Sequence, residues 1–164
     1  KPMHLGHCIE ADARFRLFVF APAGDAGGRD GAVALLCDWL EHDAASPLRR
    51  HTAPGQDVDA VIDTRAVFQR GFRALDFAAM PTLLRPHVGR YGLCDYEKVF
   101  CADSTRGDDI FALRGIDRTA GCIVIVRPDQ YVGHVLPLHA REDAREELAA
   151  YLAAILRVVG PIGR

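Results

Sequence analysis

The 164-residue sequence has a formal net charge of −2 and contains 49% hydrophobic and 26% charged residues, which is typical of a single globular domain with a buried core. This nearly balanced charge gives no electrostatic reason to expect a nucleic acid or an anionic membrane surface as a partner. No apolar run approaches the roughly 20 residues that a membrane-spanning helix needs.

The first half of the chain predicts two parallel strands joined by a helix. In chain order, the sequence predicts a strand at residues 15–20, a loop at 21–31, a helix at 32–41, a connector at 46–57 and a second strand at 58–65. Val33, Leu36 and Leu40 fall on one face of the helix, and Asp30 stands where an N-cap residue is expected. A strand, a helical crossover and another strand imply a right-handed parallel pair.

The second half predicts a hairpin followed by a helix. The predicted elements are short helices at residues 73–87 broken at Pro81 and Pro86, a strand or extended edge at 96–101, a polar loop at 104–109, strands at 122–126 and 131–136, and a helix at 141–159. Pro128 and Asp129 suit the central positions of a type I turn between the last two strands. The last helix carries an apolar stripe, which consists of Ala144, Leu148, Tyr151, Leu152, Ile155 and Val159.

The order of these elements is β-α-β, then a β-hairpin, then α. It predicts a single α/β domain of the thioredoxin-like type over residues 1–164, with a central mixed β-sheet flanked by helices. Residues 66–109 then form an insertion on that core.

Three stretches of the second half have distinctive sequences: RGIDR at 114–118, VRPDQYV at 126–132 and VLPL at 135–138. Weaker matches of the same kind are KPMHLGH at 1–7, ADARFRLFVF at 11–20, YGL at 91–93 and DYEKVFC at 95–101. Together they resemble the C-terminal domain of FAD-dependent aromatic hydroxylases of the phenol 2-monooxygenase and 3-hydroxybenzoate 4-monooxygenase type.

The resemblance implies a non-catalytic, thioredoxin-like domain that supports dimerisation. The parent enzyme would use FAD, NAD(P)H and oxygen to hydroxylate a phenol or a hydroxybenzoate. The implied partners are an upstream flavin-binding domain of the same chain and a second copy in a homodimer. Because the sequence contains no G-x-G-x-x-G fingerprint and starts at Lys1 without an initiator methionine, we expect a C-terminal fragment of a larger flavoprotein. A trimmed or processed independent small protein is the alternative.

A thioredoxin-like fold raises the question of thiol chemistry. Thiol–disulfide exchange needs a C-x-x-C motif at the start of the first helix. Residues 24–31 occupy that place, and they contain no cysteine. No proline stands just before residue 122, where redox-active thioredoxins keep a cis-proline. The five cysteines are an odd number at irregular spacing, which favours reduced thiols in the cytoplasm. The alternative function is a stand-alone thiol redox or sensor protein, with Cys94 and Cys101 as the candidate pair.

Other kinds of site have weaker signals. The loop at residues 24–31 lies where phosphate-binding loops occur but lacks the lysine and the spacing of a P-loop. Two groups are candidate metal sites: His4, His7 and Cys8, and Cys122, His134 and His139. Neither has the ligand spacing of a structural metal site. We therefore expect no catalytic, cofactor-binding or metal-binding residue in this domain.

The approach to the hairpin carries the candidate contact residues. The charged side chains there are Arg106, Asp108, Asp109, Arg114, Asp117 and Arg118. Their alternating signs predict a salt-linked loop. The functional hypothesis, which depends mainly on the resemblance, is that Arg114, Asp117 and Arg118 hold this loop against another domain or subunit.

Overall fold

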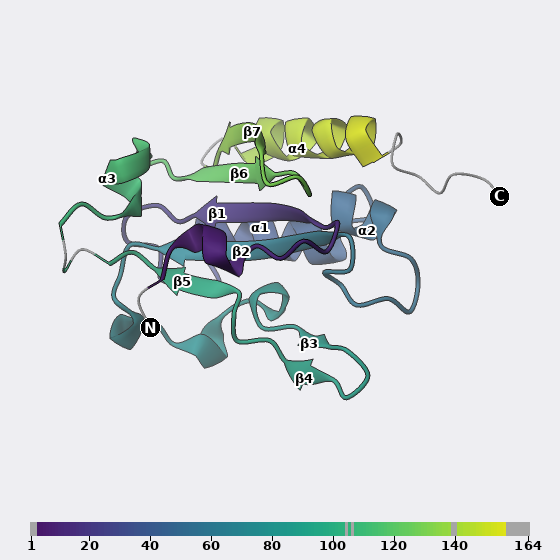
Figure 1. Ribbon diagram of the computed structural model, residues 1–164, viewed down its shortest axis with the longest axis horizontal. Helices are drawn as coiled ribbons and strands as arrows, with labels where there is room; N and C mark the ends of the chain where they lie inside the picture. The colour runs from purple at the N-terminus through teal and green to yellow at the C-terminus, as the bar shows by residue number, and fades with distance from the viewer. Residues whose placement is uncertain (1–2, 104, 106, 139–140, 157–164) are drawn as a thin grey trace.

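The computed structural model describes residues 3–103, 105, 107–138 and 141–156 (Figure 1). Within these residues, a five-stranded sheet has the order β5-β2-β1-β6-β7. Its strands are β1 (Phe15–Phe20), β2 (Ile62–Phe68), β5 (Val99–Cys101), β6 (Cys122–Val126) and β7 (Val132–Pro137). β1 is parallel to β2 and antiparallel to β6, β5 is parallel to β2, and β6 and β7 form an antiparallel hairpin. The predicted mixed sheet is confirmed, and the fold is a thioredoxin-like α/β fold.

Helices cover both faces of this sheet. One face packs against α1 (Ala32–His42), α2 (Pro47–His51) and α4 (Arg141–Leu156), which lie behind the sheet in Figure 1. The opposite face is crossed by the 3₁₀ helix η1 (Leu5–Cys8), and α3 (Ile110–Arg114) lies at one end of it. No helix in the described part of the chain is long and apolar enough to cross a membrane.

The insertion consists of short elements beside the main sheet. These are the 3₁₀ helices η2 (Phe72–Ala74), η3 (Phe77–Ala79) and η4 (Thr82–Leu84), and the two-stranded sheet of β3 (His87–Val88) and β4 (Leu93–Cys94). Short helical pieces interrupted at Pro81 and Pro86 are confirmed. The β3–β4 hairpin projects away from the main sheet in Figure 1.

Alternation along the strands divides the buried residues into two clusters. Leu17 and Val19 of β1 point to the helix-covered face together with Ile123 and Ile125 of β6. Phe18 and its neighbours on the other face pack with residues of α3 and η1. This alternation follows from the two-residue period of a strand. A sheet buried on both faces also explains why β1 is apolar almost throughout.

The second strand starts later than the sequence predicts. It was expected at residues 58–65, but β2 spans Ile62–Phe68 because the Ala60 N–H donates to the Asp57 carbonyl (3.0 Å) in a turn just before it. The predicted start of the insertion at residue 66 is therefore wrong, since the chain leaves the sheet only after Phe68. The predicted edge near residues 96–101 is confirmed as β5, which extends the main sheet.

The predicted cap of α1 is wrong. The N-cap is Gly31, and no side chain caps the helix from that position. Instead the Asp25 carboxylate accepts hydrogen bonds from the backbone N–H groups of Gly27 (2.8 Å) and Val33 (3.0 Å). A carboxylate of the chain itself thus occupies the helix N-terminus, where a phosphate-binding loop would present free N–H groups.

Two short helices were not predicted. The expected connector at 46–57 contains α2, which Ser46 caps by accepting a hydrogen bond from the Arg49 N–H (3.3 Å). The expected loop before the hairpin contains α3, which Asp109 caps and which Gly115 ends at a φ of 61°. Each helix has five residues, too few to show the apolar periodicity from which a helix is predicted.

The predicted C-terminal hairpin and helix are confirmed. The Gln130 N–H donates to the Arg127 carbonyl (2.9 Å), which closes the expected turn. In α4, Leu148 and Leu152 of the predicted apolar stripe are fully buried against the sheet. The end of the predicted helix and its stop signal, residues 157–161, lie outside the described residues.

Candidate functional site

Arg118 is the most connected residue of the predicted contact loop. Its guanidinium donates to the Asp109 carboxylate (2.5 Å) and to the Gln69 side-chain oxygen (3.2 Å), and it lies 5.4 Å from the centre of the Phe111 ring. Its backbone carbonyl accepts hydrogen bonds from the Ala23 N–H (2.6 Å) and from the side-chain amide of Gln69 (2.8 Å). Arg118 therefore fastens α3 to the segments that follow β1 and β2.

Asp109 is the partner that fixes this arrangement. Burial raises the pKa of its carboxyl, but hydrogen bonds from Arg118 and from the backbone N–H groups of Ala112 and Phe111 outweigh burial, so its pKa is lowered. The ionised carboxylate therefore caps α3 and pairs with Arg118 at neutral pH. An Asp directly before an apolar stretch is a capping signal, and it could have revealed α3 in the sequence.

The other two predicted contact residues are placed differently. Asp117 accepts hydrogen bonds from the N–H groups of Thr119 (2.7 Å) and Ala120 (3.1 Å), so it shapes the turn that leads into β6. Arg114 is exposed at the end of α3, and its guanidinium has no ion pair among the described residues. Arg106 lies outside those residues. Of the three predicted contact residues, Arg114 is thus the one whose charge is available to another surface.

The described residues give no support to a redox site among the thiols. All five cysteines lie in the described residues and none is in a disulfide. Cys94 is in β4 and Cys101 is in β5, which belong to different sheets. Burial raises the pKa of the Cys101 thiol and raises that of Cys122 to about 11. Thiols with raised pKa values stay protonated at neutral pH and react slowly, so the geometry gives no support to a thiol redox function.

The position before β6 also differs from that of a redox-active thioredoxin. Gly121 occupies it with a φ of 64°, and a Cβ there would collide with the carbonyl oxygen of Phe20. A proline cannot adopt this positive φ because its ring holds φ near −65°.

The predicted metal-site residues are scattered. In the described part of the chain, no group of three His, Cys, Asp or Glu residues is placed to hold a metal ion. The rings of His4 and His7 meet edge to face with their centres 5.5 Å apart. His134 Nε2 lies 2.7 Å from a carboxylate oxygen of Glu147, and His139 lies outside the described residues.

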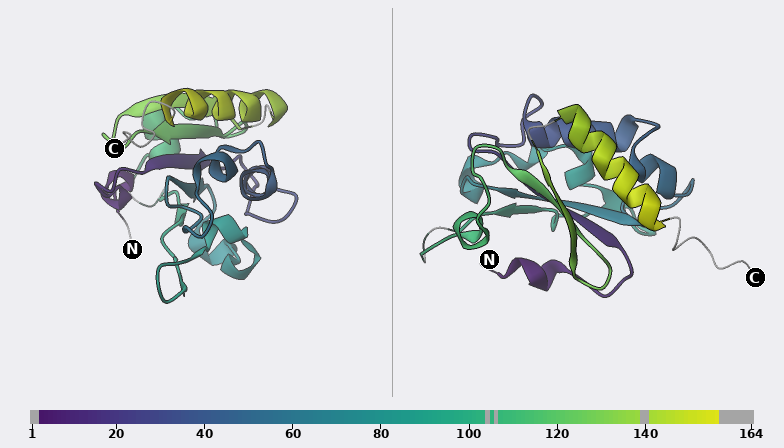
Figure 2. Two further views of the ribbon diagram at one scale, coloured as in Figure 1. Left: turned by 90° about the vertical axis from the view of Figure 1, so that its right-hand side faces the viewer. Right: turned by 90° about the horizontal axis from the view of Figure 1, so that it is seen from above.

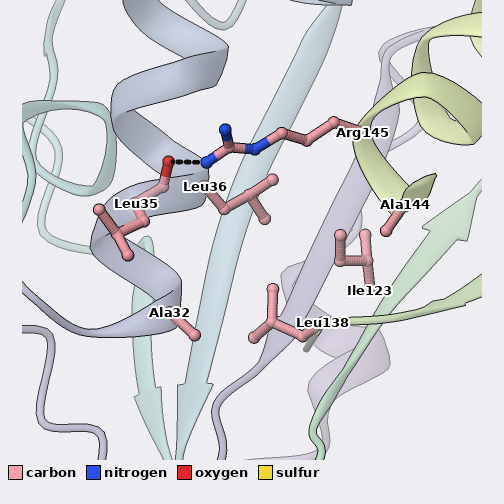
Figure 3. Close-up of a pocket in the computed structure, with 7 residues that line it drawn as sticks. All are labelled: Ala32, Leu35, Leu36, Ile123, Leu138, Ala144 and Arg145. Carbon is pink, nitrogen blue, oxygen red and sulfur yellow. Dashed lines mark hydrogen bonds between the residues drawn. The ribbon is translucent and has the colours of Figure 1, made fainter. Parts of the chain in front are cut away.

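A small pocket lies in the helix-covered core. It lies between α1, β6 and α4, and Figure 3 shows its apolar lining. Its volume is about 20 Å³, space for about one water molecule, so it cannot hold a flavin. In the same view Arg145 reaches from α4 to donate to the Leu35 carbonyl of α1 (2.8 Å), which fastens the two helices together.

A buried ion cluster lies on the opposite face and was missed by the sequence analysis. The fully buried Asp63 of β2 accepts hydrogen bonds from Lys98 Nζ (2.6 Å) and Arg65 Nε (2.9 Å). Lys98 Nζ also contacts the Asp59 carboxylate (2.5 Å), and Arg16 Nε lies 3.3 Å from Asp63. Burial raises the pKa of the Asp63 carboxyl, but Lys98 and Arg65 outweigh burial and lower its pKa.

The ion cluster continues into the segment before β1. Arg16 donates to both oxygens of the Asp12 carboxylate (2.6 and 2.7 Å), and Arg14 pairs with Asp12 (2.6 Å) and with Asp59 (3.0 Å). These contacts fix the N-terminal segment against the sheet. The available signal was the mixed pattern of β2, in which Asp63 and Arg65 point to one face while Ile62 and Ala66 point to the other.

Large apolar side chains are exposed outside both cores. They are Met3 near the N-terminus, Phe72, Tyr91, Leu93 and Tyr96 in or beside the insertion, Leu113 in α3, and Tyr131, Val132 and Val135 in the C-terminal hairpin. These exposed side chains are available for contact with another protein surface.

Comparison with known proteins points in the same direction. The model of the family described as "Phenol hydroxylase, C-terminal dimerisation domain" matches residues 1–159. The chain is 48% identical to a 3-hydroxybenzoate 4-monooxygenase of Comamonas testosteroni over 160 residues, which are 96% of this chain and 24% of that protein. It is 26% identical to the FAD-dependent monooxygenase terD of Aspergillus terreus over 145 residues, 87% of this chain and 24% of that protein. The chain thus spans about a quarter of the length of these relatives.

Proposed function

The chain belongs to the family of phenol hydroxylase C-terminal dimerisation domains, and we propose that it acts as the non-catalytic dimerisation domain of an FAD- and NAD(P)H-dependent aromatic monooxygenase. The parent protein would be cytoplasmic and would hydroxylate a phenol or a hydroxybenzoate. Its flavin and substrate sites would lie in a domain upstream of this one. The match to the family model over residues 1–159 is the observation that carries this proposal.

Two features of the domain support a role in assembly. Several of its large apolar side chains are exposed although the domain buries two apolar clusters of its own. Tyr91 and Tyr131 are among the most exposed, at 80% and 73%, and tyrosines are enriched at the centres of protein interfaces. Flavin chemistry would have to come from the rest of the parent protein.

Sedimentation equilibrium of the chain tests the dimer. We expect a mass twice that of the monomer at micromolar concentration, because a stable dimer needs a dissociation constant in that range or below. A mass equal to the monomer at all concentrations would contradict the proposal.

Titration with FAD is the second test. The domain should give no saturable change in flavin fluorescence, and stoichiometric binding would show that it is more than an assembly domain.

We also propose that the loop of Arg114, Asp117 and Arg118 contacts the upstream domain or the second copy. The guanidinium of Arg114 supports this because it is exposed and makes no ion pair with any residue that the structure describes, while the other two residues hold the loop in shape. Arg114→Ala should weaken the contact several-fold with no change in thermal stability. Arg29→Ala, at another exposed arginine, is the matched control. Equal behaviour of the two variants in the dimer and in the parent protein would refute the contact.

A further inference from the structure

The tip of the β3–β4 hairpin is an exposed aromatic and basic projection. Val88 pairs with Leu93, and the four residues between them form a turn in which the Gly92 N–H donates to the Gly89 carbonyl (3.1 Å). Arg90 and Tyr91 stand at the centre of that turn, where the guanidinium lies 5.8 Å from the centre of the Tyr91 ring. Both glycines have positive φ angles, of 72° and 57°, which fix the turn.

The charge at this tip is not used within the described residues. Arg90 is exposed and makes no ion pair there, and the Tyr91 side chain is 80% exposed. The insertion contains a second such combination, in which the Arg73 guanidinium lies 5.6 Å from the centre of the exposed Phe72 ring. Arginine and tyrosine are the residues most often found at the energetic centres of interfaces. We call the β3–β4 hairpin, residues 87–94, the arm, and its turn, residues 89–92, the arm tip.

A groove with acidic residues in its lining lies between α2 and α4. Its volume is about 490 Å³, within the range of pockets that hold large groups. The lining residues are Trp39, Asp43, Ala45, Arg50, Glu142, Arg145, Glu146, Ala149, Ala150 and Ala153. The alanines of α4 leave space beside the half-buried Trp39, so the groove is apolar inside and acidic at its rim.

The acidic rim also lacks partners within the described residues. Glu142 and Glu146 are exposed and form no ion pair there. Of the two arginines that line the groove, Arg145 is engaged with the Leu35 carbonyl and with the Trp39 ring, 5.6 Å away. Unpaired carboxylates therefore outnumber the available guanidinium groups, and the rim is complementary to the arm tip in charge.

We infer that the occupant of this groove is the arm tip of a second copy of the chain, and that the two copies exchange arms. This inference rests on the proposed dimerisation function. In Figures 1 and 2 the projecting hairpin, α2 and the C-terminal end of α4 lie toward the same end of the molecule. A two-fold axis at that end lets each tip enter the partner's groove, which gives a closed dimer with two identical contacts. Tyr91 lies against Trp39 and the alanines, and Arg90 pairs with Glu146.

The edge of the main sheet is a poorer dimer contact. β7 is the outermost strand on its side, but its register with β6 shifts between Ile125 and Val126, and the strand ends at Pro137. A bulge and a proline are devices that prevent an edge strand from pairing with another chain. The arm and the groove therefore account better for a dimer than an extended sheet does.

Complementation between two variants tests the exchange. The arm variant carries Arg90→Glu and Tyr91→Ala, and the groove variant carries Glu142→Arg and Glu146→Arg. Each alone should raise the dimer dissociation constant by about 30-fold or more. An equimolar mixture should associate more tightly than either variant, because an intact arm then meets an intact groove once in each heterodimer. Controls of the same charge change are Arg29→Glu for the arm variant and the double variant Asp30→Arg and Asp108→Arg for the groove variant, all at exposed positions, with circular dichroism to verify folding.

The outcomes separate the two proposals. If the wild-type chain sediments as a monomer, both dimerisation and arm exchange are wrong. If it is a dimer that the arm and groove variants leave intact, or if the mixture associates no better than its components, dimerisation stands and the exchange is wrong. Single reversals at Arg90 and Glu146 that weaken the dimer separately but restore it when combined in one chain would establish the pairing directly.

Discussion

The two faces of the central sheet are stabilised by different kinds of interaction. The face under α1, α2 and α4 is packed almost wholly with aliphatic and aromatic side chains, and its stability scales with the apolar area removed from water. The opposite face is apolar where α3 and η1 cover it, but elsewhere it buries Arg16, Asp63, Arg65 and Lys98. There, stability depends on whether each charge keeps its partners.

This difference predicts how each face tolerates change. A packed apolar layer loses stability in proportion to the atoms removed, and its neighbours can relax. An ion cluster fails when one member is removed, because the remaining charges stay buried without compensation. Substitutions on each face, paired with matched exposed positions, separate these two kinds of stabilisation.

The largest effect is expected at Asp63. Asp63→Ala leaves Lys98, Arg65 and Arg16 without their shared carboxylate, so we expect a loss of about 3–5 kcal/mol in the free energy of unfolding, measured with urea. The control is Asp129→Ala, which breaks a half-exposed ion pair with Arg127 (2.6 Å) and should cost less than about 1 kcal/mol. Similar losses in the two variants would show that the buried cluster contributes no more to the free energy of unfolding than a surface ion pair does.

The helix-covered face should show a graded effect. Leu148→Ala removes a fully buried side chain of α4 and should cost about 2–5 kcal/mol, with a smaller loss for Leu148→Val. Leu113→Ala makes the same chemical change at a side chain that is 68% exposed, so its effect should be near zero. A loss of stability at Leu113 as large as that at Leu148 would contradict the assignment of Leu148 to the buried core and of Leu113 to the surface.

Acid should weaken the charged face selectively. The pKa of Asp63 is lowered in the folded protein, so its contribution is fully present above the unfolded carboxyl pKa of about 3.9 and is lost as pH falls through the folded value. Urea denaturation at pH 6 and below pH 4 should show a steeper decline for the wild type than for Asp63→Asn. Parallel declines would place the acid sensitivity at other carboxyls, such as Asp12 and Asp109, whose pKa values are also lowered.

A smaller effect is expected at the cap of α3. Asp109→Ala removes the acceptor for the first N–H groups of the helix and the partner of Arg118, and should cost about 1–2 kcal/mol in thermal or urea unfolding. Asp109→Asn keeps a capping oxygen but loses the charge, so it should recover part of the loss. An Asn variant as unstable as the Ala variant would assign the effect to the ion pair alone.

Much of the fold could be predicted from local sequence signals. The apolar stripe of α4, the turn closed by Arg127 and Gln130, and the apolar run of β1 depend on residues within a few positions of one another. Arg114, Asp117 and Arg118 were chosen because their sequence resembles that of one protein family, and their role in a contact stays a prediction. The cap of α1 was missed because Asp25 acts on Val33 from eight positions away.

The order of the main strands and helices, the mixed sheet and the family can be read from the amino-acid sequence, because periodicity, turn residues and distinctive stretches are local features. Where β2 begins and which charges are buried depend on how distant segments pack against one another. Lys98 meets Asp59 and Asp63 across 39 and 35 positions of sequence, and the groove combines residues of α1, α2 and α4. Such sites arise from the packing of distant segments, and no local pattern specifies which segments will meet.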